Sequence, residues 1–234
     1  MALVQKEIKK VYLWSTQIRP PTAPRTPWAN TVAYYEFNNN LNDSSGNGYN
    51  MSLRTWTVAY NTTSWGAKYA HFNNSTYTNY TTISIDATKS YTISFWYNPQ
   101  YDYWNDWRRP IFELWISGSN TFLTVYSTLY SFSDTWFTST QIFSPTINQW
   151  YYITIVRTPT AITYYVNNTV VASWTITNTN GGNARFKFNQ VWDTDSSNYA
   201  NNIYISEFII ENKERSGQEI QDYFNNTKMF YWIS

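Results

Sequence analysis

From Thr31 onward, the chain consists of short stretches in which apolar and polar side chains alternate. The alternation is longest in residues 90–99, 148–157 and 202–211. A period of two is typical of a β-strand with one buried face. Shorter strand candidates are residues 32–37, 51–58, 67–72, 79–85, 111–117, 121–127, 136–143, 161–167, 169–175 and 186–192. Turn-forming residues separate the stretches about every 8–12 residues, so the pattern predicts an all-β, antiparallel sandwich of two sheets.

One helix is predicted near the C-terminus. Residues 216–219 read Ser-Gly-Gln-Glu, which is a capping box. Apolar residues follow at helical spacing, namely Ile220, Tyr223 and Phe224. Two asparagines at 225–226 end the helix, and the apolar segment 229–233 comes next. We interpret that segment as either a final edge strand or a contact with another chain.

Residues 1–29 differ from the rest of the chain. They contain an apolar run that predicts a short strand and an assembly anchor, made of Val11, Tyr12, Leu13 and Trp14. Four prolines between residues 20 and 27 then exclude regular structure and favour an extended linker. We therefore predict an N-terminal arm over residues 1–29 and a sandwich domain over residues 30–234.

Composition narrows the classes of function. The 234 residues carry a net charge of +1 and only 13% are charged, so nucleic acid is not an expected partner. Cysteine is absent, which excludes disulfides and thiol chemistry. No apolar run approaches the ~18 residues of a membrane span, and the first ten residues lack a signal-peptide core, so we expect no membrane insertion. Aromatic residues reach 21%, and exposed rings suit stacking on sugars or packing between subunits.

Four motifs, in this order, resemble the concanavalin A-like, laminin-G-type jelly roll. They are an opening strand and loop at residues 34–48, Ser-Tyr-Thr-Ile-Ser-Phe-Trp at 90–96, Gln-Trp-Tyr-Tyr-Ile-Thr-Ile with the following hairpin at 149–173, and a closing strand and helix from residue 203. The resemblance covers residues 31–226 and implies an antiparallel two-sheet jelly-roll sandwich with one short C-terminal helix. Such domains are mostly binding and display platforms, so the fold leaves the function open.

The resemblance also implies a cofactor, because a calcium ion near the Asp-rich first loop is common in this family. Asp43 matches that loop, and Glu207 on the closing strand is the second candidate ligand. This chain has Ser206 where the family usually carries an Asp before the Glu. A second acidic stretch, Asp193 to Asn198, spaces its oxygen side chains two apart, but it favours a plain Asx-turn loop over a cation site.

The N-terminal arm carries a separate resemblance. Residues 6–20 resemble the short N-terminal segments of phage tail, fibre and other virion structural proteins. This similarity implies a chain that docks by its arm into an assembly, with other virion proteins as partners, and displays the sandwich on the virion surface.

The densest aromatic and polar segment is residues 101–109, between two predicted strands. Its candidate carbohydrate-binding residues are Tyr101, Tyr103, Trp104, Trp107 and Arg108. Exposed rings stack on the apolar face of a sugar while polar groups bond its hydroxyls. Two alternatives stay open, since the two tryptophans also suit a lid on the core or a contact with a neighbouring subunit.

The sequence contains few residue patterns that indicate catalysis. Glycosidases need two carboxylates flanking the scissile bond, and the Glu-x-Asp-x-x-Glu arrangement of those with this fold is absent. Glu113 belongs to the nearest acidic cluster. His71 is the only histidine, and a half-buried structural role is the better interpretation. We therefore expect no enzyme activity.

Three functions follow in order of preference. The first is a non-enzymatic virion structural protein, a phage decoration, fibre or receptor-binding component that forms homo-oligomers. The second is a cell-surface or extracellular carbohydrate-binding module. The third is a glycan-active enzyme.

Overall fold

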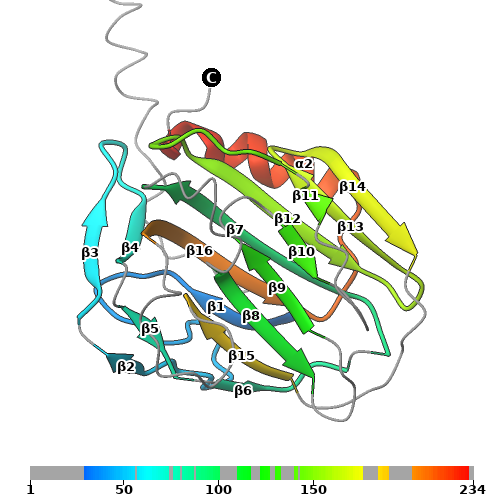
Figure 1. Ribbon diagram of the computed structural model, residues 1–234, viewed down its shortest axis with the longest axis horizontal. Helices are drawn as coiled ribbons and strands as arrows, with labels where there is room; N and C mark the ends of the chain where they lie inside the picture. The colour runs from blue at the N-terminus through cyan, green and yellow to red at the C-terminus, as the bar shows by residue number, and fades with distance from the viewer. Residues whose placement is uncertain are drawn as a thin grey trace, which may run out of the picture.

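The computed structural model describes residues 29–55, 57–73, 76–79, 81–86, 88–100, 110–116, 122–126, 130–132, 140–141, 143–175, 184–189 and 202–231. Over these residues the chain forms two antiparallel sheets packed face to face, with one helical segment near the C-terminus (Figure 1). The all-β, two-sheet prediction is therefore confirmed. The predicted arm, apart from Ala29, lies outside the described residues.

The larger sheet has eight strands in the order β14-β13-β12-β7-β16-β4-β3, with β1 paired to β16 as well. The strands are β1 (Thr31–Tyr35), β3 (Ala59–Thr62), β4 (Lys68–Phe72), β7 (Tyr91–Pro99), β12 (Tyr151–Arg157), β13 (Ala161–Val166), β14 (Thr169–Thr175) and β16 (Ile203–Glu211). The three longest alternating stretches of the sequence supply β7, β12 and β16 at its centre. This is the position where both faces of a strand are covered, and all nine residues of β7 are buried.

The smaller sheet has six strands in the order β11-β10-β9-β8-β15-β6. They are β6 (Thr81–Ile83), β8 (Pro110–Ile116), β9 (Phe122–Tyr126), β10 (Tyr130–Phe132), β11 (Thr140–Gln141) and β15 (Ala184–Phe188). Two short strands, β2 (Leu53–Thr55) and β5 (Tyr77–Thr78), pair separately.

Three strands, β3, β5 and β10, lie outside the predicted stretches. β3 lies in a stretch that showed no alternation, because as an edge strand it pairs only with β4 and most of its residues are exposed. Backbone pairing rather than burial creates such a strand, so the hydrophobic pattern does not report it.

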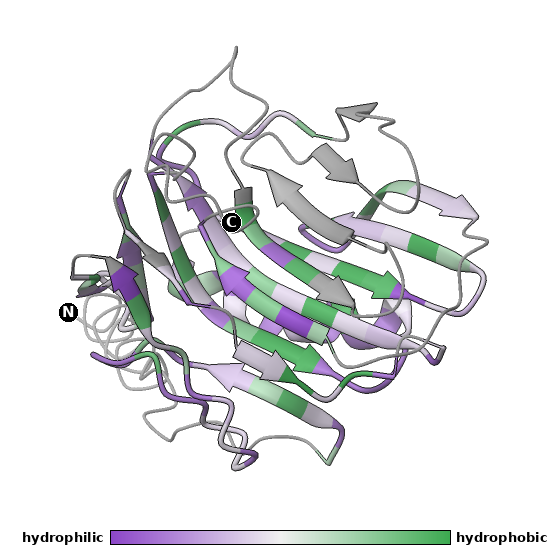
Figure 2. Cartoon of the chain, turned by 60° about the horizontal axis from the view of Figure 1, so that its bottom comes forward, coloured by the Kyte–Doolittle hydropathy of each residue, from purple (hydrophilic) through white to green (hydrophobic). Residues whose placement is uncertain are grey.

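The core between the two sheets is aromatic. Phe208 of β16 packs against the rings of Phe95, Phe112 and Phe188, with ring centroids 5.3, 5.3 and 4.7 Å away. Figure 2 shows the matching alternation of hydrophobic and hydrophilic bands along the central strands. Edge-to-face and offset pairs of this kind add to the free energy that burial of the rings already contributes.

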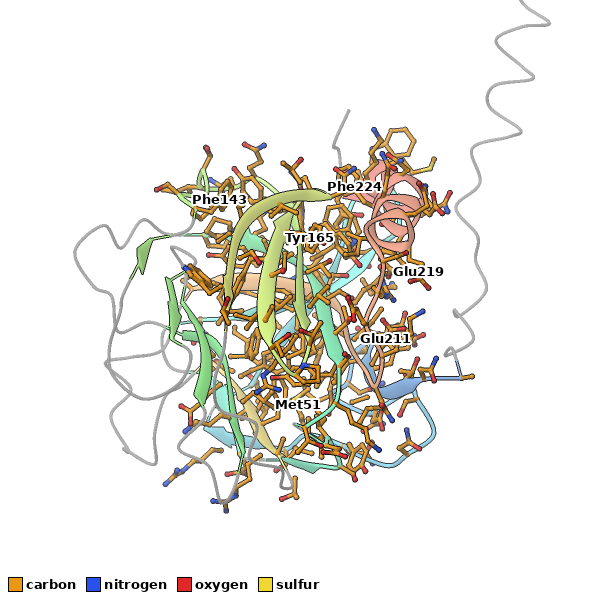
Figure 3. All side chains as sticks on the ribbon, turned by 90° about the vertical axis from the view of Figure 1, so that its right-hand side faces the viewer. Met51, Phe143, Tyr165, Glu211, Glu219 and Phe224 are labelled. Atoms are coloured by element: carbon orange, nitrogen blue, oxygen red, sulfur yellow. The ribbon has the colours of Figure 1, made fainter. Side chains whose placement is uncertain are left out.

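The helix α2 (Gly217–Thr227) begins as predicted. Ser216 Oγ accepts a hydrogen bond from the Glu219 amide at 3.2 Å, and the Glu219 carboxylate accepts one from the Ser216 amide at 2.8 Å. The helix packs its buried face on the outer side of the larger sheet, opposite the smaller sheet (Figure 3). It thus forms a partial third layer.

The segment after the helix corrects one prediction. Residues 228–231 form the short 3-10 helix η2 (Lys228–Tyr231), so an edge strand there was wrong. Tyr231 stacks on Trp96 of β7 with ring centroids 4.0 Å apart and planes at 16°, and its hydroxyl lies 2.6 Å from Ser206 Oγ. A turn of helix brings the ring over the indole, which an extended strand would not do. The described part of this segment therefore makes an intramolecular contact.

Candidate functional site

The outer face of the larger sheet carries a group of aromatic side chains in which three rings are partly buried and the fourth, Trp150, is buried. We define the outer-face aromatic cluster as Tyr69 and His71 of β4, Trp150 just before β12, and Tyr204 of β16. Neighbouring residues on the inner face of the same strands, such as Ala70 and Ile203, are fully buried in the core. Strand parity therefore directs the cluster away from the core.

The rings of the cluster contact one another around Tyr204. The Tyr204 ring lies 4.8 Å from Tyr69 at an interplanar angle of 35°, and 4.9 Å from His71 at 84°. Trp150 meets Tyr69 edge-on at 5.5 Å. Packing of this kind holds the rings in fixed positions, so little rotational entropy remains to be lost when a ligand settles on them.

Amide side chains border the cluster. His71 Nε2 and Asn202 Oδ1 lie 2.7 Å apart, and Gln100 Nε2 donates to Asn98 Oδ1 at 2.6 Å. The amide oxygen accepts, so Nε2 carries the proton in this pair. Amides supply both donors and acceptors. Asn98 is buried, whereas Gln100 and Asn202 are partly exposed, and these two are suitable for hydroxyl groups.

The register of the sheet brings these residues together. Tyr204 lies opposite His71 on one side and opposite Asn98 on the other. Three segments that are far apart in the sequence thus meet on one patch. Sequence reasoning missed this patch: the alternation indicated which residues face outward, but not which strands are neighbours.

The cluster and its amide border contain no Asp, Glu, Lys or Arg. A surface of rings and amides stacks on apolar faces and bonds neutral polar groups, but it offers no carboxylate for general acid catalysis and no cation to pair with an anionic ligand.

The predicted carbohydrate-binding residues, Tyr101, Tyr103, Trp104, Trp107 and Arg108, lie outside the described residues, as does the predicted anchor Val11, Tyr12, Leu13 and Trp14. The Asp193 loop also lies outside them. Those assignments stay predictions.

The first candidate calcium ligand, Asp43, has its carboxylate engaged by the protein. Its Oδ1 accepts hydrogen bonds from the amides of Tyr34 and Ser45, both at 2.9 Å. Its Oδ2 accepts from the Ser45 hydroxyl at 2.7 Å and the Tyr49 amide at 3.0 Å. These four bonds tie the first loop to β1 and give Asp43 a structural role.

The second candidate, Glu207, lies at an irregularity in β16, where its φ is 48° and the register shifts between Ser206 and Ile209. Its Oε2 accepts a hydrogen bond from the Tyr223 hydroxyl of α2 at 2.8 Å. In the part of the chain that the structure describes, no group of three His, Cys, Asp or Glu residues is placed to hold a metal ion. Calcium binding remains a prediction from the family resemblance.

Glu113 and His71 were the two residues considered for catalysis. Glu113 of β8 is buried and lies opposite Lys187 of β15, which is buried too. His71 contacts an amide and a tyrosine ring, as described above, rather than a serine or a carboxylate.

The comparisons with known proteins bear on the fold. No protein-family model matches the chain, and no curated protein matches it. Solved structures do. Domain 4 of an extracellular arabinanase from Geobacillus stearothermophilus, solved in complex with arabinotriose, has a TM-score of 0.64 and 20% identity over 82% of this chain and 97% of its own.

Toxin binding domains form a second group of similar structures. The binding domain of botulinum neurotoxin serotype G has a TM-score of 0.60 and 20% identity, and that of Paraclostridial Mosquitocidal Protein 1 has 0.58 and 18%. The two matches cover 83% and 84% of this chain. They cover only 50% and 52% of the toxin domains, so this chain spans about half the length of each. At these identities the shared property is the jelly-roll type of β-sandwich. No helix of the described residues is long and apolar enough to cross a membrane.

Proposed function

We propose that this chain is a non-catalytic, lectin-like binding module and that its outer-face aromatic cluster holds an uncharged saccharide. The observation that carries the proposal is the arrangement of Tyr69, His71 and Tyr204 in ring contact, bordered by the partly exposed amides of Gln100 and Asn202. Rings cover the apolar face of a pyranose or furanose, and amides bond its hydroxyls. Within the part of the chain that the structure describes, no charged side chain belongs to this patch, which favours a neutral sugar over a sialylated or sulfated one.

The similar structures agree with this class of function. One is a domain solved with arabinotriose, and the others are described as binding or receptor-binding domains. They support a recognition domain that acts outside the cell or on its surface, and they support the absence of catalysis. The ligand of a neighbour is not carried over, because the site proposed for this chain is argued from its own residues.

A role as a virion structural protein is a more specific alternative to a binding module. It depends on the arm and on its resemblance to phage tail and fibre proteins, and the arm falls outside the described residues. Virion partners and homo-oligomers therefore stay predictions, and a lectin-like module at the tip of a fibre would satisfy both ideas.

A binding experiment tests the proposal. The purified chain is screened on an array of neutral and acidic glycans, and the affinity for arabinotriose and for the strongest neutral hit is measured by calorimetry. Tyr204→Ala removes the central ring, and we expect the affinity to fall roughly three- to tenfold. Tyr165→Ala is the matched control, a half-buried tyrosine on the outer side of the same sheet but on β13 (Figure 3).

Two results would overturn the location of the site. One is unchanged affinity in Tyr204→Ala. The other is loss of affinity in Trp104→Ala or Trp107→Ala alone, which would move the site to the segment predicted from sequence. Absence of binding to every neutral glycan, with a normal melting temperature, would overturn the function itself.

A further inference from the structure

Four large apolar side chains are exposed among the described residues, and two of them lie at one corner of the molecule. Trp65, 38% exposed, is in the turn that joins β3 to β4, and Met229, 43% exposed, is in η2. Figure 1 shows that turn beside the C-terminal end of the helical segment. We call Trp65, Met229 and the flanking Lys68 and Lys228 the Trp65 corner.

Hydrogen bonds hold the two halves of the corner together. Thr63 Oγ1 donates to the backbone carbonyl of Phe230 at 2.8 Å and accepts from the Ala67 amide at 3.0 Å. The turn closes on itself through the Thr63 amide, which donates to the Ala67 carbonyl at 2.8 Å. Gly66 has a φ of +95°, a conformation that favours glycine. The structure thus presents the tryptophan on a closed turn that is fastened to the C-terminal segment.

The corner is positively charged. Residues 59–72 and 225–231 contain Lys68 and Lys228 and no Asp or Glu. The acidic residues of α2, Glu219 and Asp222, lie within its first six residues, and none follows in the rest of the helix. The Lys228 ammonium lies 5.7 Å from the centre of the Phe224 ring, and Lys68 Nζ donates to Thr62 Oγ1 at 2.8 Å. Lys68 follows Trp65 by three residues and Lys228 directly precedes Met229, so each exposed apolar side chain has a lysine close to it along the chain.

We propose that the Trp65 corner adsorbs to the surface of an anionic phospholipid membrane. Tryptophan prefers the interface between headgroups and acyl chains, and lysine places its charge at the headgroups while its stem lies along apolar surface. Each lysine near such a surface adds attraction to the anionic lipid. This is surface adsorption by side chains and involves no membrane span.

Two other occupants fit less well. A second copy of the chain would bring like charges together, because a two-fold contact at this corner places lysines against lysines. An acidic protein partner would be expected to meet arginine, which bonds carboxylates in a bidentate fashion, and neither stretch of the corner contains one. The proposal is independent of the saccharide site, because the test uses lipids without sugar headgroups.

The chain has no cysteine, which allows a clean fluorescence test. Ser64→Cys, next to Trp65 and exposed, is labelled with an environment-sensitive dye. The labelled chain is titrated with vesicles of phosphatidylcholine alone and of phosphatidylcholine mixed with phosphatidylserine. We expect a fluorescence increase only with the anionic vesicles, reversed by salt. A label at Thr169→Cys, exposed at the start of β14, should not respond.

Charge variants complete the test. Lys68→Gln should weaken partition to the anionic vesicles roughly fivefold. Lys89→Gln makes the same change of charge at an exposed lysine just before β7, outside the corner. It should leave the partition to anionic vesicles unchanged. Trp65→Ser should also weaken it, with the fold checked by melting temperature. No response at position 64, an equal response at position 169, or equal effects of the two lysine variants would overturn the proposal.

Discussion

A buried ion pair beneath α2 allows a quantitative prediction. Arg215, just before the helix, bonds through Nε to Glu211 Oε2 at the end of β16, and their side chains are 4% and 2% exposed. The guanidinium also donates through Nη1 to the Tyr152 hydroxyl at 3.2 Å and lies 5.0 Å from the centre of the Tyr223 ring. Figure 3 shows Glu211 on the side of the sheet that the helix covers.

The perturbation is Arg215→Met, which keeps much of the side-chain volume but removes the charge. It leaves the Glu211 carboxylate buried without its cation. Removing one partner of a buried pair destabilises a protein by about 3–5 kcal/mol. For a domain of this size, a loss of 1 kcal/mol lowers the melting temperature by roughly 2–4 °C, so we expect a fall of about 6–20 °C at neutral pH.

The loss of stability in Arg215→Met should depend on pH, and the titration of Glu211 decides whether the loss grows or shrinks as the pH falls. Burial raises the pKa of Glu211 above its ordinary 4.5, and the neighbouring Arg215 opposes that rise. Burial lowers the pKa of Arg215, but Tyr152 and Glu211 raise it by more, so the guanidinium stays charged. Removing the arginine raises the carboxyl pKa further. A carboxyl group whose pKa is raised on folding has no effect on stability at a pH below its ordinary pKa. It destabilises the folded state as the pH rises through the pKa of the folded state.

The assay is urea unfolding of the wild type and the variant at neutral pH and at pH 4. The deficit of Arg215→Met should shrink at the lower pH, where Glu211 is protonated. The double variant Glu211→Leu/Arg215→Met should recover most of the loss, because an apolar pair of similar volume needs no compensation. A deficit at neutral pH below about 1 kcal/mol, or one of equal size at both pH values, would refute the reasoning.

Three further predictions concern stability. The pKa of Glu219 is lowered to about 2 by hydrogen bonds first from Lys213 and then from the Ser216 backbone, so Glu219→Gln should destabilise above the ordinary pKa of 4.5 and lose its effect as the pH falls to about 2. Thermal melts across that range check this, and an effect that persists at the acidic end contradicts it. The pKa of Glu36 is raised, chiefly by burial, so Glu36→Gln should increase the melting temperature at neutral pH and have no effect well below 4.5. Tyr231→Ala removes a buried ring stacked on an indole and should cost about 3–5 kcal/mol by chemical denaturation, whereas Met229→Ala on the same turn should be close to neutral.

The helix and the strands differ in how far local sequence decides them. The capping box at Ser216 and Glu219 is a local interaction over three residues, so the start of α2 follows from the sequence. The apolar run after it was expected to be either an edge strand or a contact with another chain. Its described part, up to Tyr231, is a 3-10 turn, because the position of Trp96 decides where Tyr231 must lie. That position belongs to β7, more than a hundred residues earlier.

The candidate site also depends on contacts between segments that are distant in the sequence, so local sequence does not predict it. The odd and even positions of each strand follow from the period of two, so the sequence indicates that Tyr69, His71 and Tyr204 do not share a face with Phe72 and Ile203. It does not say that β4 lies beside β16 and β16 beside β7, because the alternating strands share the same kind of pattern and backbone hydrogen bonds do not discriminate among partners.

The sequence by itself therefore determined the class of fold, the two-sided character of the central strands, the C-terminal helix and the absence of thiol chemistry. These depend on side-chain periodicity, capping and composition, which are local properties. Only the tertiary structure decided that an aromatic and amide patch forms where β4, β16 and β7 meet, and that a tryptophan turn is fastened to the C-terminal segment. Both depend on which distant segments pack together, and that choice is made by the burial of the whole core.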